Sequence, residues 1–190
     1  MELVRKLAGT LTYLSPLEPQ AAELWYRWHN DLETGLLAAS PGHRTPGTLA
    51  EYQQTIARFL EQKAHAFLIV DAASDRPIGW CALFVIDPVS RRALLSALIG
   101  EKEYWGKGYG VDALRTLVGY GFHIVNLNSI ELVVHDDNAR ARRCYEKLGF
   151  QVVGRKRQAR ILGERKLDVL VMDLLAEEFT GPSPIPVSSR

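Results

Sequence analysis

The stretch from Ile99 to Gly110 constrains the fold more than any other part of the chain, because a strand pattern runs through closely spaced glycines directly into a helix pattern. Glycines let the backbone adopt positive φ and approach a ligand closely, and the first turn of a helix offers N–H donors and a positive dipole end. Beyond the glycines, apolar residues recur at the spacing of an amphipathic helix: Val111, Leu114, Leu117, Val118, Phe122 and Val125. The sequence therefore predicts an anion-binding loop at which a pyrophosphate docks.

The spacing of these glycines excludes a nucleoside-triphosphate loop. That motif, G-x-x-x-x-G-K-[ST], requires a second glycine five residues after the first, but counting from Gly100 the position is Trp105. Lys107 is also followed by a glycine, where the motif needs a hydroxyl residue to bind a metal.

A dinucleotide fingerprint, G-x-G-x-x-[GA], is the stronger rival, because Gly108, Gly110 and Ala113 satisfy it. Glu131 lies near the distance at which that motif places its ribose-binding acid. The acid belongs at the carboxyl end of a strand, however, whereas Glu131 lies at the start of the apolar segment 130–134. The rest of the chain is also too short for the further βα units that such a fold needs. This interpretation stays open as an alternative.

The segment from Tyr104 to Gly110 resembles the acetyl-CoA pyrophosphate loop of the GNAT acetyltransferase superfamily, whose pattern is [QR]-x-x-G-x-[GA]. Trp105 stands at the Gln/Arg position, a departure that resembles the branch modifying the N-termini of ribosomal proteins. A second segment, from Asn138 to Phe150, is similar to the N-x-x-[SA]…Y-E-K-x-G-F helix of the same superfamily. The two motifs occur in the order of the superfamily, and fainter resemblance extends over nearly the whole chain.

The resemblance implies an α/β fold, a single GNAT-like sandwich with a mixed, splayed central sheet flanked by helices. Residues 1–179 would form this domain, and residues 180–190, rich in proline and serine, a disordered tail. The strands ending near Gly100 and Val134 would splay apart and leave a V-shaped slot for the pantetheine arm. Periodicity and turn signals predict a strand over 7–14, helices over 21–28 and 49–62, strands over 66–70, 78–86, 93–99 and 130–134, and a closing pair over 150–153 and 167–174 linked by a basic segment, 155–166.

The resemblance also implies an acyl donor, acetyl-CoA, and the residues that bind it. Asn138 would serve in addition as the N-cap of a short helix that Gly149 terminates. No spacing of histidines or cysteines indicates a ligand set, so no metal is expected. The residues expected to bind the donor are Ile99, Trp105, Gly106, Lys107, Gly108, Tyr109, Gly110, Asn138 and Tyr145.

The resemblance makes Tyr145 the general acid, which protonates the CoA thiolate as it leaves. Its neighbour Cys144 is expected to point to a different face of the helix and to be structural. The general base stays open, because leucines and a serine occupy residues 94–96, where many relatives carry a glutamate on the strand. Glu101, Glu103 and His135 remain, and the candidates singled out are Glu101, just past the first splayed strand, and His135, after the second.

The activity implied is direct transfer of acetyl to a primary amine, with the α-amino group of a protein or peptide as the leading acceptor. The family forms its acceptor pocket from the helix after the first strand and from the closing hairpin, which here gives Trp28, Asn30, Glu33 and Arg157 as substrate-binding residues. A polyamine pocket should hold several converging carboxylates, whereas this hairpin is basic. A small-molecule amine and a non-catalytic acyl-CoA-binding sensor stay open as alternatives.

Composition limits the kinds of partner and the compartment that we expect for this protein. With 23 Lys and Arg against 22 Asp and Glu, the net charge is +1, so nothing points to nucleic acid. Two cysteines in unrelated settings make no disulfide framework and suit a reducing compartment. No apolar run has the length of a membrane span or the pattern of a signal core, so we expect a cytoplasmic protein without membrane association. Formation of a homodimer stays open.

Overall fold

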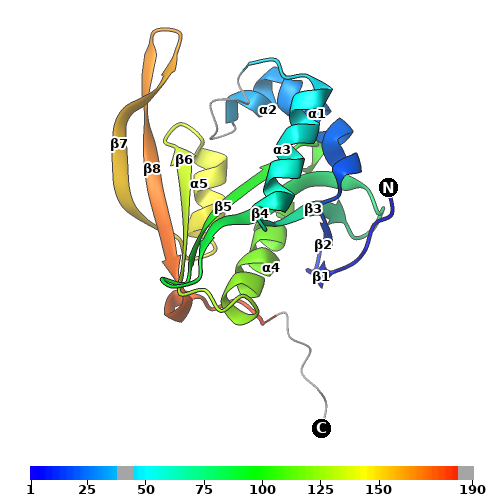
Figure 1. Ribbon diagram of the computed structural model, residues 1–190. Helices are drawn as coiled ribbons and strands as arrows, with labels where there is room; N and C mark the ends of the chain where they lie inside the picture. The colour runs from blue at the N-terminus through cyan, green and yellow to red at the C-terminus, as the bar shows by residue number, and fades with distance from the viewer. Residues whose placement is uncertain (38–44, 184–190) are drawn as a thin grey trace.

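The computed structural model describes residues 1–37 and 45–183. Residues 184–190, most of the predicted tail, lie outside the described residues. The described chain forms one eight-stranded sheet in the order β1-β2-β3-β4-β5-β6-β8-β7, with helices on both of its faces (Figure 1). Its elements are β1 (Leu7–Ala8), β2 (Thr12–Pro16), α1 (Ala22–Asn30), α2 (Leu32–Leu37), α3 (Leu49–Glu61), β3 (His65–Asp71), β4 (Pro77–Asp87), β5 (Arg92–Ile99), α4 (Tyr109–His123), β6 (Ser129–His135), α5 (Ala139–Glu146), β7 (Gln151–Leu162) and β8 (Arg165–Leu175).

The predicted α/β sandwich is confirmed, and most predicted elements lie within a few residues of their expected bounds. The helix predicted over 49–62 is α3, which begins at a capping box formed by Thr48 and Glu51. The strands predicted over 66–70 and 78–86 are β3 and β4, an antiparallel pair. Local sequence signals are strong here, because caps and apolar runs mark each boundary.

The single strand predicted over 7–14 is wrong, because this segment is a hairpin of β1 and β2. The turn between them is held by Asp112 in the first turn of α4. Its carboxylate accepts hydrogen bonds from the backbone N–H groups of Thr10, Leu11 and Thr12 at 2.9, 3.0 and 2.9 Å. The partner that makes this turn lies about a hundred residues away in the chain, so the pattern within the segment does not reveal it.

Two apolar layers enclose the sheet. Helices α1 and α3 cover one face, where Trp25 stacks on Trp80 of β4 with 4.4 Å between ring centroids. Helices α4 and α5 cover the other face, where Leu117 and Tyr145 are buried (Figure 1). The central strands are therefore buried on both faces, which is why they appear in the sequence as nearly continuous apolar runs.

The strands β5 and β6 pair in parallel over only three residues each and then separate. Residues 92–94 lie opposite residues 129–131, whereas 95–99 have no partner in β6 within the described register. β6 instead continues along β8 over its whole length. The expected splay is thus confirmed. The dinucleotide interpretation is wrong, because Glu131 lies where the two strands are still paired and β5–β6 is the single parallel pair among the described strands.

The closing pair is much longer than predicted. β7 continues to Leu162 and β8 starts at Arg165, so the basic segment 155–166 is itself a protruding hairpin rather than a link (Figure 1). Its strands lack an apolar alternation because most side chains of this β7 extension are exposed on both faces. A register shift turns Arg160 inward, where it is 3% exposed and forms an ion pair with Asp137 at 3.3 Å.

Candidate active site

A cavity of about 500 Å³ runs through the gap between β5 and β6. On the side of α4 and α5 its wall includes Leu114 and Tyr145, and on the side of α1 and α3 it includes His29 and Trp80. Ser96 of β5 lies between the two sides. Because the cavity reaches both faces of the sheet, a donor held on one face can meet an acceptor that enters from the other.

The glycine loop brings the start of α4 to this cavity. Gly106 and Gly108 have φ of 74° and 94°, a left-handed conformation in which side chains are strained. A β-carbon at Gly106 would meet nothing within 4 Å, so the backbone there borders open space, whereas one at Gly110 would be in van der Waals contact with Ile99 Cγ1 at 3.7 Å. Both glycines line the cavity. Backbone of this kind at a helix N-terminus fits the pyrophosphate of acetyl-CoA.

The wall of the cavity carries three cations, Arg140, Arg143 and Lys147, all on α5 or next to it. The guanidinium of Arg140 lies 3.8 Å above the ring of Trp105, a cation–π contact. Trp105 is itself fixed, because its Nε1 donates to the carbonyl oxygen of Ile99 at 2.7 Å. A cation is therefore present beside the loop although a tryptophan stands at the Gln/Arg position of the motif. These three residues are not among those predicted from the sequence to bind the donor.

Most residues expected to bind the donor line the cavity. Lys107 and Tyr109 do not: Lys107 is exposed, and the ring of Tyr109 packs edge-on against Tyr104 at 4.8 Å. The predicted N-cap is present, because the Asn138 side chain accepts a hydrogen bond from the N–H of Ala141 at 3.1 Å. The expected residues that do line the cavity are Ile99, Trp105, Gly106, Gly108, Gly110, Asn138 and Tyr145.

Tyr145 and Cys144 both line the cavity. Burial raises the pKa of the Tyr145 phenol above its ordinary value, so the hydroxyl keeps its proton at neutral pH. Burial also raises the pKa of the Cys144 thiol to about 11, which makes it a poor nucleophile. Cys144 points to a different face of α5 from Tyr145, as expected, and its side chain nevertheless lines the same cavity. Successive helix residues differ by about 100°, and the cavity extends around that much of α5.

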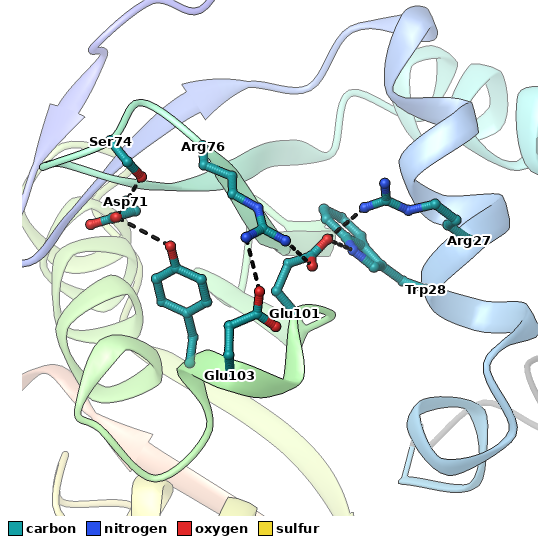
Figure 2. Close-up of polar contacts among 8 residues, drawn as sticks. Arg27, Trp28, Asp71, Ser74, Arg76, Glu101 and Glu103 are labelled. Carbon is teal, nitrogen blue, oxygen red and sulfur yellow. Dashed lines mark hydrogen bonds and ion pairs between the residues drawn. The ribbon is translucent and has the colours of Figure 1, made fainter.

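Glu101 does not line the cavity, and both of its carboxylate oxygens are held by donors (Figure 2). Arg27 and the indole N–H of Trp28, both on α1, donate to Oε1 at 2.6 and 2.8 Å, and Arg76 before β4 donates to Oε2. Arg76 also pairs with Glu103 at 2.8 Å. We call Arg27, Trp28, Arg76 and Glu101 the loop clamp. It holds the start of the glycine loop against α1 and against the turn before β4. The contacts of Glu101 are therefore those of a residue that fixes the position of the loop.

The four residues expected to bind the acceptor are absent from the described cavity wall. Trp28 belongs to the loop clamp, and the Asn30 side chain bonds to the backbone before α3 at 2.9 and 3.0 Å. Glu33 is paired with Lys102 at 3.0 Å, and Arg157 is exposed on the β7 extension. Three of the four therefore hold structure around the site rather than face its cavity.

Two histidines line the cavity. His135, at the end of β6, is one of the candidates predicted for the general base. The other, His29 of α1, was not singled out, because no spacing in the sequence marks it. It is 2% exposed, its Nδ1 lies 2.9 Å from the Trp25 carbonyl oxygen, and its ring stacks on Tyr52 at 5.4 Å. Only the packing of α1 against β4 brings it to the cavity.

Splayed strands, a glycine loop at a helix N-terminus, a cationic wall and a protonated tyrosine together define an acyltransferase that takes its acyl group from a CoA thioester. The chain belongs to the GNAT family: the family model described as "Acetyltransferase (GNAT) domain" matches residues 12–151. It is an N-acetyltransferase that uses acetyl-CoA as donor.

Named relatives agree with this assignment. The chain is similar to "Probable N-acetyltransferase YjcK" of Bacillus subtilis (strain 168), with 37% identity over 159 residues, 78% of this chain and 84% of the relative. It is 40% identical over 76 residues, 40% of each chain, to "Spermidine N(1)-acetyltransferase" of Escherichia coli (strain K12). A crystal structure of spermidine N-acetyltransferase from Vibrio cholerae with CoA and spermine shares the fold, with a TM-score of 0.78, 24% identity and coverage of 88% of this chain and 97% of that one.

Across residues 1–37 and 45–183, no helix is long and apolar enough to cross a membrane. In the same ranges, no group of three or more His, Cys, Asp or Glu side chains is arranged to hold a metal ion.

Proposed function

We propose that this N-acetyltransferase acts on the α-amino group of a compact acceptor, such as an amino-acid amide or the first residue of a short peptide. The observation that carries the proposal is the chemical character of the cavity wall, which is aromatic and apolar on the acceptor side and cationic along α5. Trp80, Phe84 and Leu98 line the acceptor side, and Arg140 is the cation beside the loop. The described wall includes no Asp or Glu, and residues 38–44 contain none in their sequence.

Such a wall favours an amine that enters without charge, because an ammonium group would lose its hydration and gain no counter-charge. An α-amino group has a pKa of about 7.7 to 8.0, so about a third of it is neutral near pH 7.5. An alkylamine with a pKa of about 10.4 is neutral to only about one part in a thousand at the same pH. The wall therefore favours α-amino groups over polyamines, because an α-ammonium group loses its proton at a lower free-energy cost than an alkylammonium group does.

In this proposal each part of the site has a stated task. The glycine loop and the cations of α5 hold the phosphates of the donor, and acetyl-CoA when bound supplies the thioester carbonyl that an amine attacks. Tyr145 holds the proton that the leaving sulfur needs. Glu101 positions the loop, and the proton of the amine passes to an imidazole in the cavity wall, for which His135 is the candidate that the sequence predicted.

A polyamine is the second candidate acceptor. It is favoured by the 40% identity with the Escherichia coli spermidine N(1)-acetyltransferase and by the fold shared with the Vibrio cholerae enzyme. A polyamine carries several ammonium groups, however, and carboxylates such as Asp31 and Glu33 lie outside the cavity, where Lys102 pairs with both at 2.7 and 3.0 Å. A polyamine would thus have to compete with Lys102 for them.

An acceptor panel tests the proposal. Turnover of acetyl-CoA is measured with alaninamide, phenylalaninamide, a short peptide with a free N-terminus, the same peptide N-acetylated as a control, and spermidine. We expect kcat/KM for the free α-amines to exceed that for spermidine. Efficient acetylation of spermidine with none of the α-amines would overturn the proposed acceptor. Donor binding without turnover of any amine would favour a non-catalytic acyl-CoA sensor.

A further inference from the structure

The protruding hairpin of β7 and β8 concentrates positive charge that the chain as a whole lacks. Residues 155–168 contain six basic and two acidic side chains, whereas the net charge of the whole chain is +1. Most side chains of the β7 extension are exposed, and the outer part of the hairpin stands away from the helices (Figure 1). A local cationic surface of this kind fits an anionic partner by charge complementarity.

Two nearby acids neutralise some of these cations. Asp168 of β8 pairs with Arg155 at 2.8 Å. Asp137, just after β6, pairs with Arg160 and Arg165 at 3.3 and 3.4 Å. These three arginines therefore hold the hairpin together and hold it against the rest of the molecule.

Lys156 and Arg157 are the cations that this pairing leaves available. Both are exposed, and neither forms an ion pair with any residue in the ranges 1–37 and 45–183. Arg157 is attracted to Asp168 at longer range. The two side chains are neighbours in the chain, so they present two positive charges at one place on the hairpin.

The buried side chain of Arg160 fixes the hairpin beside the cavity. Its guanidinium donates to the carbonyl oxygen of Leu36 in α2 at 2.5 Å, and it pairs with Asp137. Leu37 and Asn138, the next residues in those two segments, line the cavity. The hairpin is therefore attached to the residues that border the cavity, and its cations have a defined position relative to it.

The register of the sheet places Lys156 on the acceptor side. Lys156 lies opposite Val169 of β8, and Val169 lies opposite His135 of β6. Directly opposite residues of antiparallel strands share a face, with about 5 Å between their β-carbons, so Lys156 begins about 10 Å from His135 in the cavity wall. Val134 and Leu170, which alternate with this row, belong to the apolar layer under α4 and α5. The row itself therefore faces the side of α1.

This distance matches the length of a few residues of an extended peptide. Such a peptide advances about 3.3 Å per residue, so with its α-amino group in the cavity its second to fourth residues can lie along the hairpin. Carboxylates at those positions would meet the two available cations. A nucleic acid would instead need cations for many phosphates, and two exposed cations on a nearly neutral chain provide few.

We propose that the hairpin is a docking surface for acidic residues that follow the first residue of a peptide acceptor, an inference that rests on the proposed function. Lys156 and Arg157 pair with aspartate or glutamate side chains at the second to fourth positions of the acceptor. Because these contacts lie far from the reacting carbonyl, they hold the substrate and the transition state equally and act on KM rather than on kcat.

Peptide acceptors that differ only in charge test this surface. Each is a hexapeptide amide that begins with alanine and carries aspartates, asparagines or lysines at its second, third and fourth positions. We expect kcat/KM to decrease in that order, by about 10-fold from the aspartate to the lysine peptide at low salt. The difference should shrink at about 0.5 M salt, which screens exposed charges.

Charge reversal on the hairpin identifies the residues responsible. In Lys156→Glu/Arg157→Glu we expect the ratio of kcat/KM for the aspartate peptide to that for the lysine peptide to fall by about 10-fold or more. In Lys156→Gln/Arg157→Gln it should fall by less. Arg58→Glu/Arg115→Glu is the matched control, because it makes the same change in net charge at exposed positions of α3 and α4 outside the cavity wall, and it should keep the wild-type ratio.

Three results would overturn the docking surface. They are equal kcat/KM for the three peptides, a preference that survives in Lys156→Glu/Arg157→Glu, and a preference lost to the same extent in the control variant. Binding of a single-stranded oligonucleotide that this hairpin variant abolishes, with no charge preference among the peptides, would assign the surface to nucleic acid instead.

Alaninamide separates these outcomes from failure of the proposed function, because it has no residues that could reach the hairpin. An enzyme that acetylates neither alaninamide nor any of the peptides refutes the function. An enzyme that acetylates alaninamide and ignores the charge of the peptides refutes only the docking surface.

Discussion

At the scale of single residues, the thiol of Cys144 indicates how burial in this cavity changes the pKa of a sulfur group. Burial raises its pKa to about 11, and the same loss of hydration makes a departing CoA thiolate in this cavity more basic than in water. Burial also raises the pKa of the Tyr145 phenol, so both partners of the proton transfer lie above their solution values of about 10 and 8.5. The raised pKa of the sulfur favours its protonation by the phenol, which keeps its own proton until the thiolate forms.

Tyr145→Phe keeps the ring and removes this proton, so we expect kcat to fall on the order of 10²-fold with little change in the Kd of acetyl-CoA. Because the pKa of Tyr145 lies above its ordinary value, the wild type should lose no proton donor on the alkaline side up to about pH 9. Tyr26→Phe, on the exposed side of α1, is the matched control. Unchanged turnover with chemistry rate-limiting would show that water protonates the thiolate.

At the scale of elements, the sequence predicts best where one segment contains its own signals. The glycine loop, α4 and the cap of α5 by Asn138 were each predicted because residues a few positions apart fix them. The turn between β1 and β2 could not be predicted, because its N–H groups bond to Asp112 on α4. The length of β7 could not be predicted either, since most of its side chains are exposed and follow no apolar alternation.

The dependence of that turn on Asp112 gives an element-scale prediction. Asp112→Ala removes the acceptor of three backbone N–H groups and of the Thr12 hydroxyl, so we expect the free energy of unfolding to fall by about 2 kcal/mol. Asp112→Asn keeps one carbonyl acceptor and should lose less. Urea denaturation of the three proteins checks the order. An Asp112→Ala variant as stable as the wild type would mean that water replaces the carboxylate at no cost.

At the scale of the whole molecule, contacts between segments far apart in the chain assemble the site. These contacts could not be predicted from the sequence. The glycine loop was predicted from its own residues, but the cations beside it come from α5, and His29 reaches the cavity only through the packing of α1 on the sheet. Glu101 was one of the candidates for the base because it follows a splayed strand. Its partners, Arg27 and Arg76, lie 74 and 25 residues away.

The loop clamp therefore connects the glycine loop to α1, which carries Trp28 of the clamp and, next to it, His29 of the cavity wall. In Glu101→Gln an amide group replaces a carboxylate between two guanidinium groups, which loosens the loop from α1. We expect KM for both acetyl-CoA and the amine to rise about 3- to 10-fold, with kcat changed by less than about 3-fold. Glu103→Gln is the matched control. Glu103 is half exposed, and its ion pair within the described residues is with Arg76. Such a surface ion pair contributes little to stability.

Steady-state kinetics with each substrate varied in turn separates this positioning role from the catalytic one that the sequence suggested. A general base at Glu101 would instead lower kcat on the order of 10²-fold in Glu101→Gln. A rise in KM for acetyl-CoA without a rise for the amine would show that the clamp holds only the loop. A rise for both, with kcat nearly unchanged, is the result expected if Glu101 acts only through its contacts with Arg27, Trp28 and Arg76, which hold the glycine loop against α1.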